Sequence, residues 1–162
     1  MMAYHGGYLC DHAYPGEAGG TGRRVQLTLP AAAQAVRLAR RATRDALAAW
    51  QLGLLEETAV LLVSELVTNA VRHARDTGTV TLELRSAGTW VRVEVQDADP
   101  QWPQPRNPAG CDESGFGFVL VDSLAGQWGV RQTPAGKVVW AVLDADEEPG
   151  EGPRPAGARR RP

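Results

Sequence analysis

The fold of this protein is best inferred from the stretch Ser64-Glu-Leu-Val-Thr-Asn-Ala-Val-Arg-His73. It lies in an almost continuously apolar run that predicts a long helix over residues 55–74, buried on most sides. At ~100° per residue, the polar side chains of this helix fall within about 60° of one another and form one stripe. We therefore expect the stripe to face a cavity; its members are Thr58, Glu65, Asn69 and Arg72.

Two residues of this stripe are suited to phosphate chemistry. Glu65 and Asn69 stand four residues apart, so their side chains point into the same space. An amide oxygen is a hard ligand that suits Mg²⁺, and a carboxylate one turn away can deprotonate an attacking hydroxyl or water. The helix alone leaves an alternative open, in which the stripe is the solvent-facing side of an amphipathic helix.

The remaining sequence predicts an α+β fold with two layers. Another helix is expected between Pro30 and Leu52, stopped by Gly53. The alternation of polar and apolar residues, with the turn residues between them, predicts strands on both sides of the helices. A mixed, mostly antiparallel sheet with helices on one face is therefore expected. Its strands are predicted over 24–29, 79–85, 90–96, 127–132 and 137–143, with a short helix over 117–125.

Composition limits the classes of function. The chain has 162 residues, of which 43% are apolar, and a net charge of −2. One domain over residues 23–143 is expected, between a flexible tail over 1–22 and a disordered tail over 144–162. The small net charge disfavours direct nucleic-acid binding, and no apolar run is long enough to cross a membrane. With no secretory signal and two cysteines, a cytoplasmic protein without disulfides is expected.

Two further features point to a nucleotide. Gly115 and Gly117 precede the short helix, where glycine lets the backbone approach a ligand and the free N–H groups favour phosphate. Asp97 follows a predicted strand, and its carboxylate can accept a hydrogen bond from an exocyclic amine such as that of adenine. Taken singly, both features also fit ordinary turns. The P-loop motif is absent, because the only lysine, Lys137, lacks the flanking residues that the motif requires.

Together these motifs resemble the GHKL (Bergerat-fold) ATP-binding family of gyrases and histidine kinases. The resemblance is closest to anti-sigma factor serine kinases and to the short actinobacterial regulators called ATP-binding proteins. It covers about residues 23–143 and rests on three motifs in order. They are residues 64–73 as the N box, Asp97 with its loop as the first glycine box, and Gly115-Phe-Gly117 with residues 119–129 as the second.

The resemblance implies roles for individual residues. Asn69 would coordinate Mg²⁺ that bridges the ATP phosphates, and Glu65 would be the general base for a serine hydroxyl on a partner protein. Asp97 would bind the adenine amine. The remaining binding residues would lie near the phosphates, under a mobile lid: Arg72, His73, Gly115, Phe116 and Gly117.

The resemblance also implies the partners, which are a sigma factor, an anti-sigma factor antagonist, or both; a homodimer is left open. Two departures from the family pattern bear on catalysis. The first glycine box is usually D-x-G-x-G, and here Asp99 and Gln101 stand where its glycines are usual, while Phe116 stands where a basic residue is frequent. A second hypothesis is therefore a nucleotide-dependent binding protein without catalysis.

Overall fold

The structure is a computed structural model that describes residues 22–74, 78–99 and 116–146. The expected tails therefore lie almost entirely outside the described residues. The described order of helices and strands is the order predicted from the sequence. The elements are β1 (Arg23–Pro30), α1 (Gln34–Trp50), the 3-10 turn η1 (Gly53–Leu55), α2 (Glu56–His73), β2 (Thr79–Ala87), β3 (Trp90–Asp97), α3 (Phe116–Leu124), β4 (Gln127–Thr133) and β5 (Gly136–Asp144).

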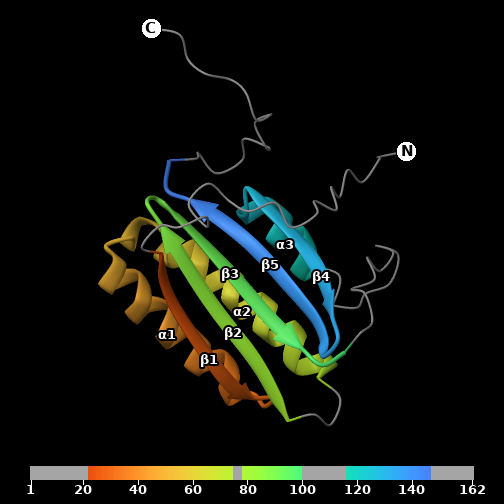
Figure 1. Cartoon of the computed structure of the whole chain (residues 1–162). Coiled ribbons are helices and arrows are strands. Elements are labelled where there is room, and N and C mark those ends of the chain that lie inside the picture. The colour runs from red at the N-terminus through yellow and green to blue at the C-terminus, as the bar shows by residue number, and fades with distance from the viewer. Residues whose placement is uncertain (1–21, 75–77, 100–115, 147–162) are drawn as a thin grey trace, which may run out of the picture.

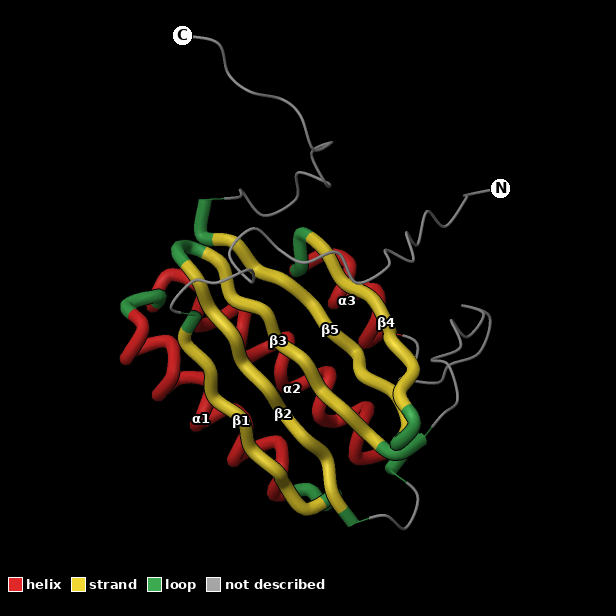
Figure 2. The backbone as a smooth tube through the Cα atoms, in the orientation of Figure 1, coloured by secondary structure: helices red, strands yellow, loops and turns green. Residues whose placement is uncertain are grey.

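The strands form one sheet in the order β1-β2-β3-β5-β4, and every neighbouring pair is antiparallel. Figures 1 and 2 show the described helices behind this sheet, with the opposite face toward the viewer. The predicted two-layer α+β architecture is confirmed. Two short turns account for the hairpins: β2 and β3 are joined at Gly88, whose φ of 64° suits glycine, and β4 and β5 are joined at residues 134–135.

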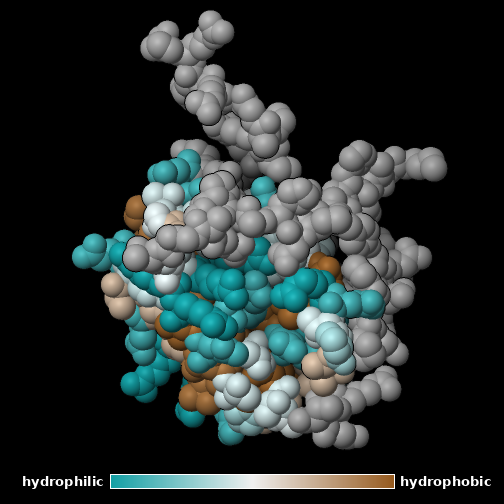
Figure 3. Space-filling model, in the orientation of Figure 1, coloured by the Kyte–Doolittle hydropathy of each residue, from teal (hydrophilic) through white to brown (hydrophobic). Residues whose placement is uncertain are grey.

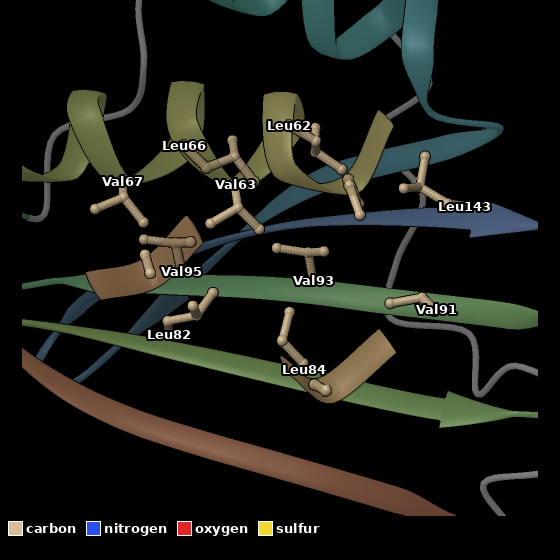
Figure 4. Packing of buried hydrophobic residues seen from close by; sticks show 14 of the residues in the cluster. Leu62, Val63, Leu66, Val67, Leu82, Leu84, Val91, Val93, Val95 and Leu143 are labelled. Carbon is tan, nitrogen blue, oxygen red and sulfur yellow. The ribbon is translucent and has the colours of Figure 1, made fainter. Parts of the chain in front are cut away.

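The core lies between α2 and the middle of the sheet, where β2, β3 and β5 run side by side. Figure 4 shows apolar side chains of α2 directed at those of the strands. Each side chain of this kind contributes about 1.5–3 kcal/mol when it is fully buried. The residues at the centre, all at most 2% exposed, are Leu62, Val63, Leu66 and Val67 of α2 with Leu82, Leu84, Val91, Val93 and Val95 of the sheet.

The first helix differs from its prediction at both ends. Pro30 does not open it, because Pro30 is the last residue of β1 and lies opposite Thr79; α1 begins only at Gln34. The helix ends at Trp50, before the predicted stop at Gly53. Gln51 adopts a left-handed backbone with φ of 61°, and its N–H is bonded to carbonyls of the last turn. Gln51, and not a glycine, therefore ends this helix.

The sheet face away from the helices is charged. Across β1 and β2, Nε of Arg24 lies 2.9 Å from Oε1 of Glu83. On β3, Nε of Arg92 lies 2.7 Å from Oε1 of Glu94. The guanidinium of Arg92 also lies 4.6 Å from the centre of the Trp140 ring, a cation–π contact. Figure 3 shows hydrophilic side chains gathered across this face. In a two-layer fold, such side chains shield the second side of the sheet from water.

The ion pairs of Glu83 make stability depend on pH. Partial burial alone raises the pKa of Glu83, but hydrogen bonds and charges from Arg24 and Arg85 outweigh it and hold the pKa below its ordinary value of 4.5. A pKa lowered by folding stabilises the protein above pH 4.5, and this contribution is lost as pH falls through the folded value. Glu83→Gln is therefore expected to lower the free energy of unfolding by about 1 kcal/mol at pH 7.

Urea unfolding of the wild type and of Glu83→Gln, at neutral pH and at increasingly acid pH, measures the difference in their free energies of unfolding. This difference should shrink below pH 4.5. Glu57→Gln is the control, because Glu57 is exposed and makes no ion pair within the described part of the chain. It should change stability by less than about 0.5 kcal/mol. A difference at Glu83 that is the same at every pH would contradict the prediction.

Candidate functional site

Three faces of α2 have different surroundings. The first packs on the sheet through residues such as Val63 and Leu66. The second meets α1, where the Ser64 hydroxyl accepts a hydrogen bond of 2.6 Å from Arg40. The polar stripe lies roughly 120° from Ser64, on the third face. Since α2 lies between α1 and α3 and contacts both, this stripe is on the flank toward α3.

Within the stripe, burial separates the candidate residues. Glu65 and Asn69 are half-buried, whereas Arg72 and His73 are exposed at the last turn. The Nδ2 atom of Asn69 is buried and makes no hydrogen bond with any described residue. A buried polar atom without a partner costs about 1–3 kcal/mol, so the fold keeps an unsatisfied amide at this position.

Asp97 ends β3, and it is buried at 4% exposure beside a lysine that the sequence prediction did not include. The Nζ of Lys137 lies 3.0 Å from Oδ1 of Asp97, and the backbone N–H of Asp99 donates to the same oxygen at 2.9 Å. Lys137 itself is 4% exposed and lies opposite Asp97 in the β3–β5 register. The carboxylate is therefore fixed from two sides through one of its oxygens.

The same cluster connects Asp97 to α2. Lys137 Nζ also donates to the carbonyl oxygen of Asp99 at 3.1 Å and lies 3.7 Å from its Oδ2. That Oδ2 atom is 3.9 Å from Nδ1 of His73, the last residue of α2. Because Asn69 stands one turn before His73, the polar stripe and the buried carboxylate lie at the same end of the domain.

A glycine holds this end of the sheet together. Gly136 has φ of 135°, and a Cβ added to it would lie 2.0 Å from the carbonyl oxygen of Asp97 and 2.6 Å from Cα of Ala98. Only glycine allows β5 to begin so close to the backbone that follows β3. Gly136 thus places Lys137 opposite the carboxylate.

The second glycine motif is described only in part. Gly115 and the side chain of Phe116 lie outside the described residues, while Gly117 belongs to the first turn of α3. The indole N–H of Trp128 in β4 donates to Asp122 in α3 at 2.9 Å. Figures 1 and 2 show α3 running along β4, with its C-terminal end where β4 begins. The start of α3 therefore points back toward the end of the sheet that carries Asp97.

The structure thus brings Asn69, His73 and Asp97 to one end of the domain, with Glu65 one turn further along the stripe. Sequence reasoning missed Lys137, Gly136 and Asp99. One signal was available for Lys137, since it is the only lysine among 17 basic residues and follows a glycine at the start of a strand. Its pairing with Asp97 depends on the β3–β5 register, which joins residues 40 positions apart.

This arrangement combines the buried carboxylate of Asp97, an amide with an unpaired nitrogen and a second carboxylate, which together can bind a polar ligand and take up a proton. Over residues 22–74, 78–99 and 116–146, no group of three or more His, Cys, Asp or Glu side chains is placed to hold a metal ion. None of the described helices is both long and apolar enough to span a membrane.

Comparisons with known proteins agree with the fold. The sequence model of the histidine kinase-like ATPase domain family matches residues 29–143. An uncharacterized protein of Streptomyces coelicolor is 39% identical over 74 residues, which cover 43% of this chain and 70% of that protein. A solved structure of the RsbU and RsbW domains of Rv1364c from Mycobacterium tuberculosis matches with a TM-score of 0.59 and 21% identity. The match covers 75% of this chain and 32% of that one.

Proposed function

We propose that this chain, which belongs to the histidine kinase-like ATPase domain family, binds Mg²⁺-ATP at the end of α2 and thereby regulates a partner protein. Asn69 supplies a side-chain oxygen to the metal, and Asp97 accepts a hydrogen bond from the adenine amine. ATP supplies the phosphoryl group that is transferred. Glu65 accepts the proton of a serine hydroxyl on the partner, which is an anti-sigma factor antagonist, while a sigma factor is the protein held in check.

The observation that carries the proposal is the buried Nδ2 atom of Asn69, which makes no hydrogen bond with any described residue and can donate one to a phosphate oxygen. A side chain that lacks a partner inside the protein is suited to bind one from outside. Mg²⁺ prefers oxygen ligands and is usually held by one or two side chains together with substrate phosphates. An amide whose nitrogen donates to a phosphate leaves its oxygen for the metal, which fits this mode and needs no cluster of acidic ligands.

The proposed partner rests on the resemblance to anti-sigma factor kinases. The structural neighbour carries an RsbW domain, and at 21% sequence identity the likeness shows a shared fold. A second function, nucleotide-dependent binding without catalysis, is favoured by Asp99 and Gln101, which stand where glycines are usual after Asp97. The backbone carbonyl and the carboxylate of Asp99 both contact Lys137. Transfer of phosphate to an antagonist serine separates the two functions.

The proposed metal ligand gives a direct test. Asn69→Ala is expected to weaken ATP binding in the presence of Mg²⁺ by about 10–100-fold, because the metal loses its protein ligand. The gain in affinity that Mg²⁺ gives the wild type should be absent in the variant. Calorimetric titration with ATP, with and without Mg²⁺, measures both quantities.

Gln34→Ala is the matched control, since it removes an exposed amide from the start of α1, away from the polar stripe. Its affinity for Mg²⁺-ATP should equal that of the wild type. If Asn69→Ala binds Mg²⁺-ATP as tightly as the wild type does, the assignment of Asn69 is wrong. If the wild type binds no ATP, the proposed function itself is wrong.

A further inference from the structure

Beside the carboxylate of Asp97 lies a buried cation that the proposed function does not use. Lys137 is the only lysine in the chain, and its side chain is 6% exposed. Its ammonium group has three hydrogens, and three oxygens surround it. They are Asp97 Oδ1 at 3.0 Å, the Asp99 carbonyl at 3.1 Å and Asp99 Oδ2 at 3.7 Å. A buried charge persists only when it is compensated in this way.

The two hydrogen bonds that described residues make to the Asp97 carboxylate both go to Oδ1, one from Lys137 and one from the Asp99 N–H. Oδ2 is left as the acceptor. A carboxylate oxygen accepts hydrogen bonds, so Oδ2 is suited to an amine on a ligand. The contact of Oδ1 with Lys137 is one of two that fix the orientation of this carboxylate, and loss of the ammonium leaves it held by the Asp99 N–H alone.

We propose that Lys137 is a positioning residue that sets nucleobase specificity, by holding the first carboxylate oxygen of Asp97 so that the second is directed at the base. This inference rests on the proposed function. A purine with an amino group at C6 donates a hydrogen bond to such an oxygen. A purine with a carbonyl at C6 meets it with a second acceptor and is rejected. The chain is therefore selective for adenine nucleotides through a contact that Lys137 does not make itself.

Inosine triphosphate is the sharpest probe, because its base presents a carbonyl at C6 where ATP presents an amine. The wild type is expected to bind ATP about 10–100-fold more tightly than inosine triphosphate, the range for a hydrogen bond to a charged group. In Lys137→Met this preference should fall to within about threefold, because Asp97 loses the contact that keeps its second oxygen directed at the base. Lys137→Leu, which also removes the donor, should lose the preference too and serves if the methionine variant does not fold.

Arg92→Met is the matched control. Arg92 is 2% exposed and is ion-paired with Glu94 on β3, but on the opposite sheet face from Asp97. The Arg92→Met variant loses a similarly buried cation from the same sheet. It should therefore have lower thermal stability and an unchanged preference for ATP. Calorimetry with both nucleotides and thermal unfolding of each variant give the two readouts.

The outcomes are distinct. If the folded Lys137 variant keeps the wild-type preference, Lys137 is only a structural ion-pair partner and the inference is wrong. The same holds if the wild type binds both nucleotides equally, although ATP binding then still supports the proposed function. If the wild type binds neither nucleotide, the proposed function fails, and this inference fails with it.

Discussion

Replacing Glu65 by glutamine is expected to slow phosphoryl transfer from ATP to a partner serine by about 10²–10⁴-fold, the usual contribution of a general base. Glutamine keeps the shape of the side chain and is unable to accept the hydroxyl proton. ATP affinity should change little, because the proposed contacts to the nucleotide come from Asn69 and Asp97. Single-turnover transfer of labelled phosphate to a cognate antagonist, with calorimetry of ATP binding, measures both effects.

Glu57→Gln on the same helix is the control, since Glu57 is exposed in the first turn of α2, more than two turns from Asn69. It should transfer phosphate at the wild-type rate. A Glu65→Gln variant as fast as the wild type would remove Glu65 from the mechanism. A wild type that binds Mg²⁺-ATP and transfers nothing to any antagonist would favour the non-catalytic function.

The fold was accessible from the sequence because its signals are local. The apolar run of α2 and the alternating residues of the strands each specify one element, and a sheet with helices on one face buries their apolar sides. Helix ends were less accessible. Gln51 takes a left-handed backbone where the sequence offered Gly53, because packing at the end of α1 overrides local propensity.

The candidate site was accessible only in part. Glu65 and Asn69 share a face through a spacing of four residues, which helix geometry fixes. Asp97 and Lys137 meet only through strand register, and a register shift of one residue would send the lysine to the other face of the sheet. No local pattern encodes that pairing. The end of a predicted strand indicated Asp97, the resemblance to a family implied its role, and the structure revealed the cation beside it.

Gly136 is the residue on which this pairing depends. Gly136→Ala is expected to lower the free energy of unfolding by about 3 kcal/mol or more, because two costs add. The φ of 135° is strained for any residue with a Cβ, and the added methyl would lie 2.0 Å from the Asp97 carbonyl oxygen. That neighbour is backbone, so β3 and β5 must separate at this end to relieve the contact.

Separation of the strands moves Asp97 and Lys137 apart, so the variant should also lose ATP affinity, even under conditions where it remains folded. Gly88→Ala isolates the conformational cost, because Gly88 has φ of 64° with no atom within 4 Å of an added Cβ. It should cost about 1–2 kcal/mol and leave ATP affinity unchanged. Urea unfolding and calorimetry on both variants decide the matter. Equal losses of stability at the two glycines, with ATP binding intact, would show that β5 need not begin against Asp97.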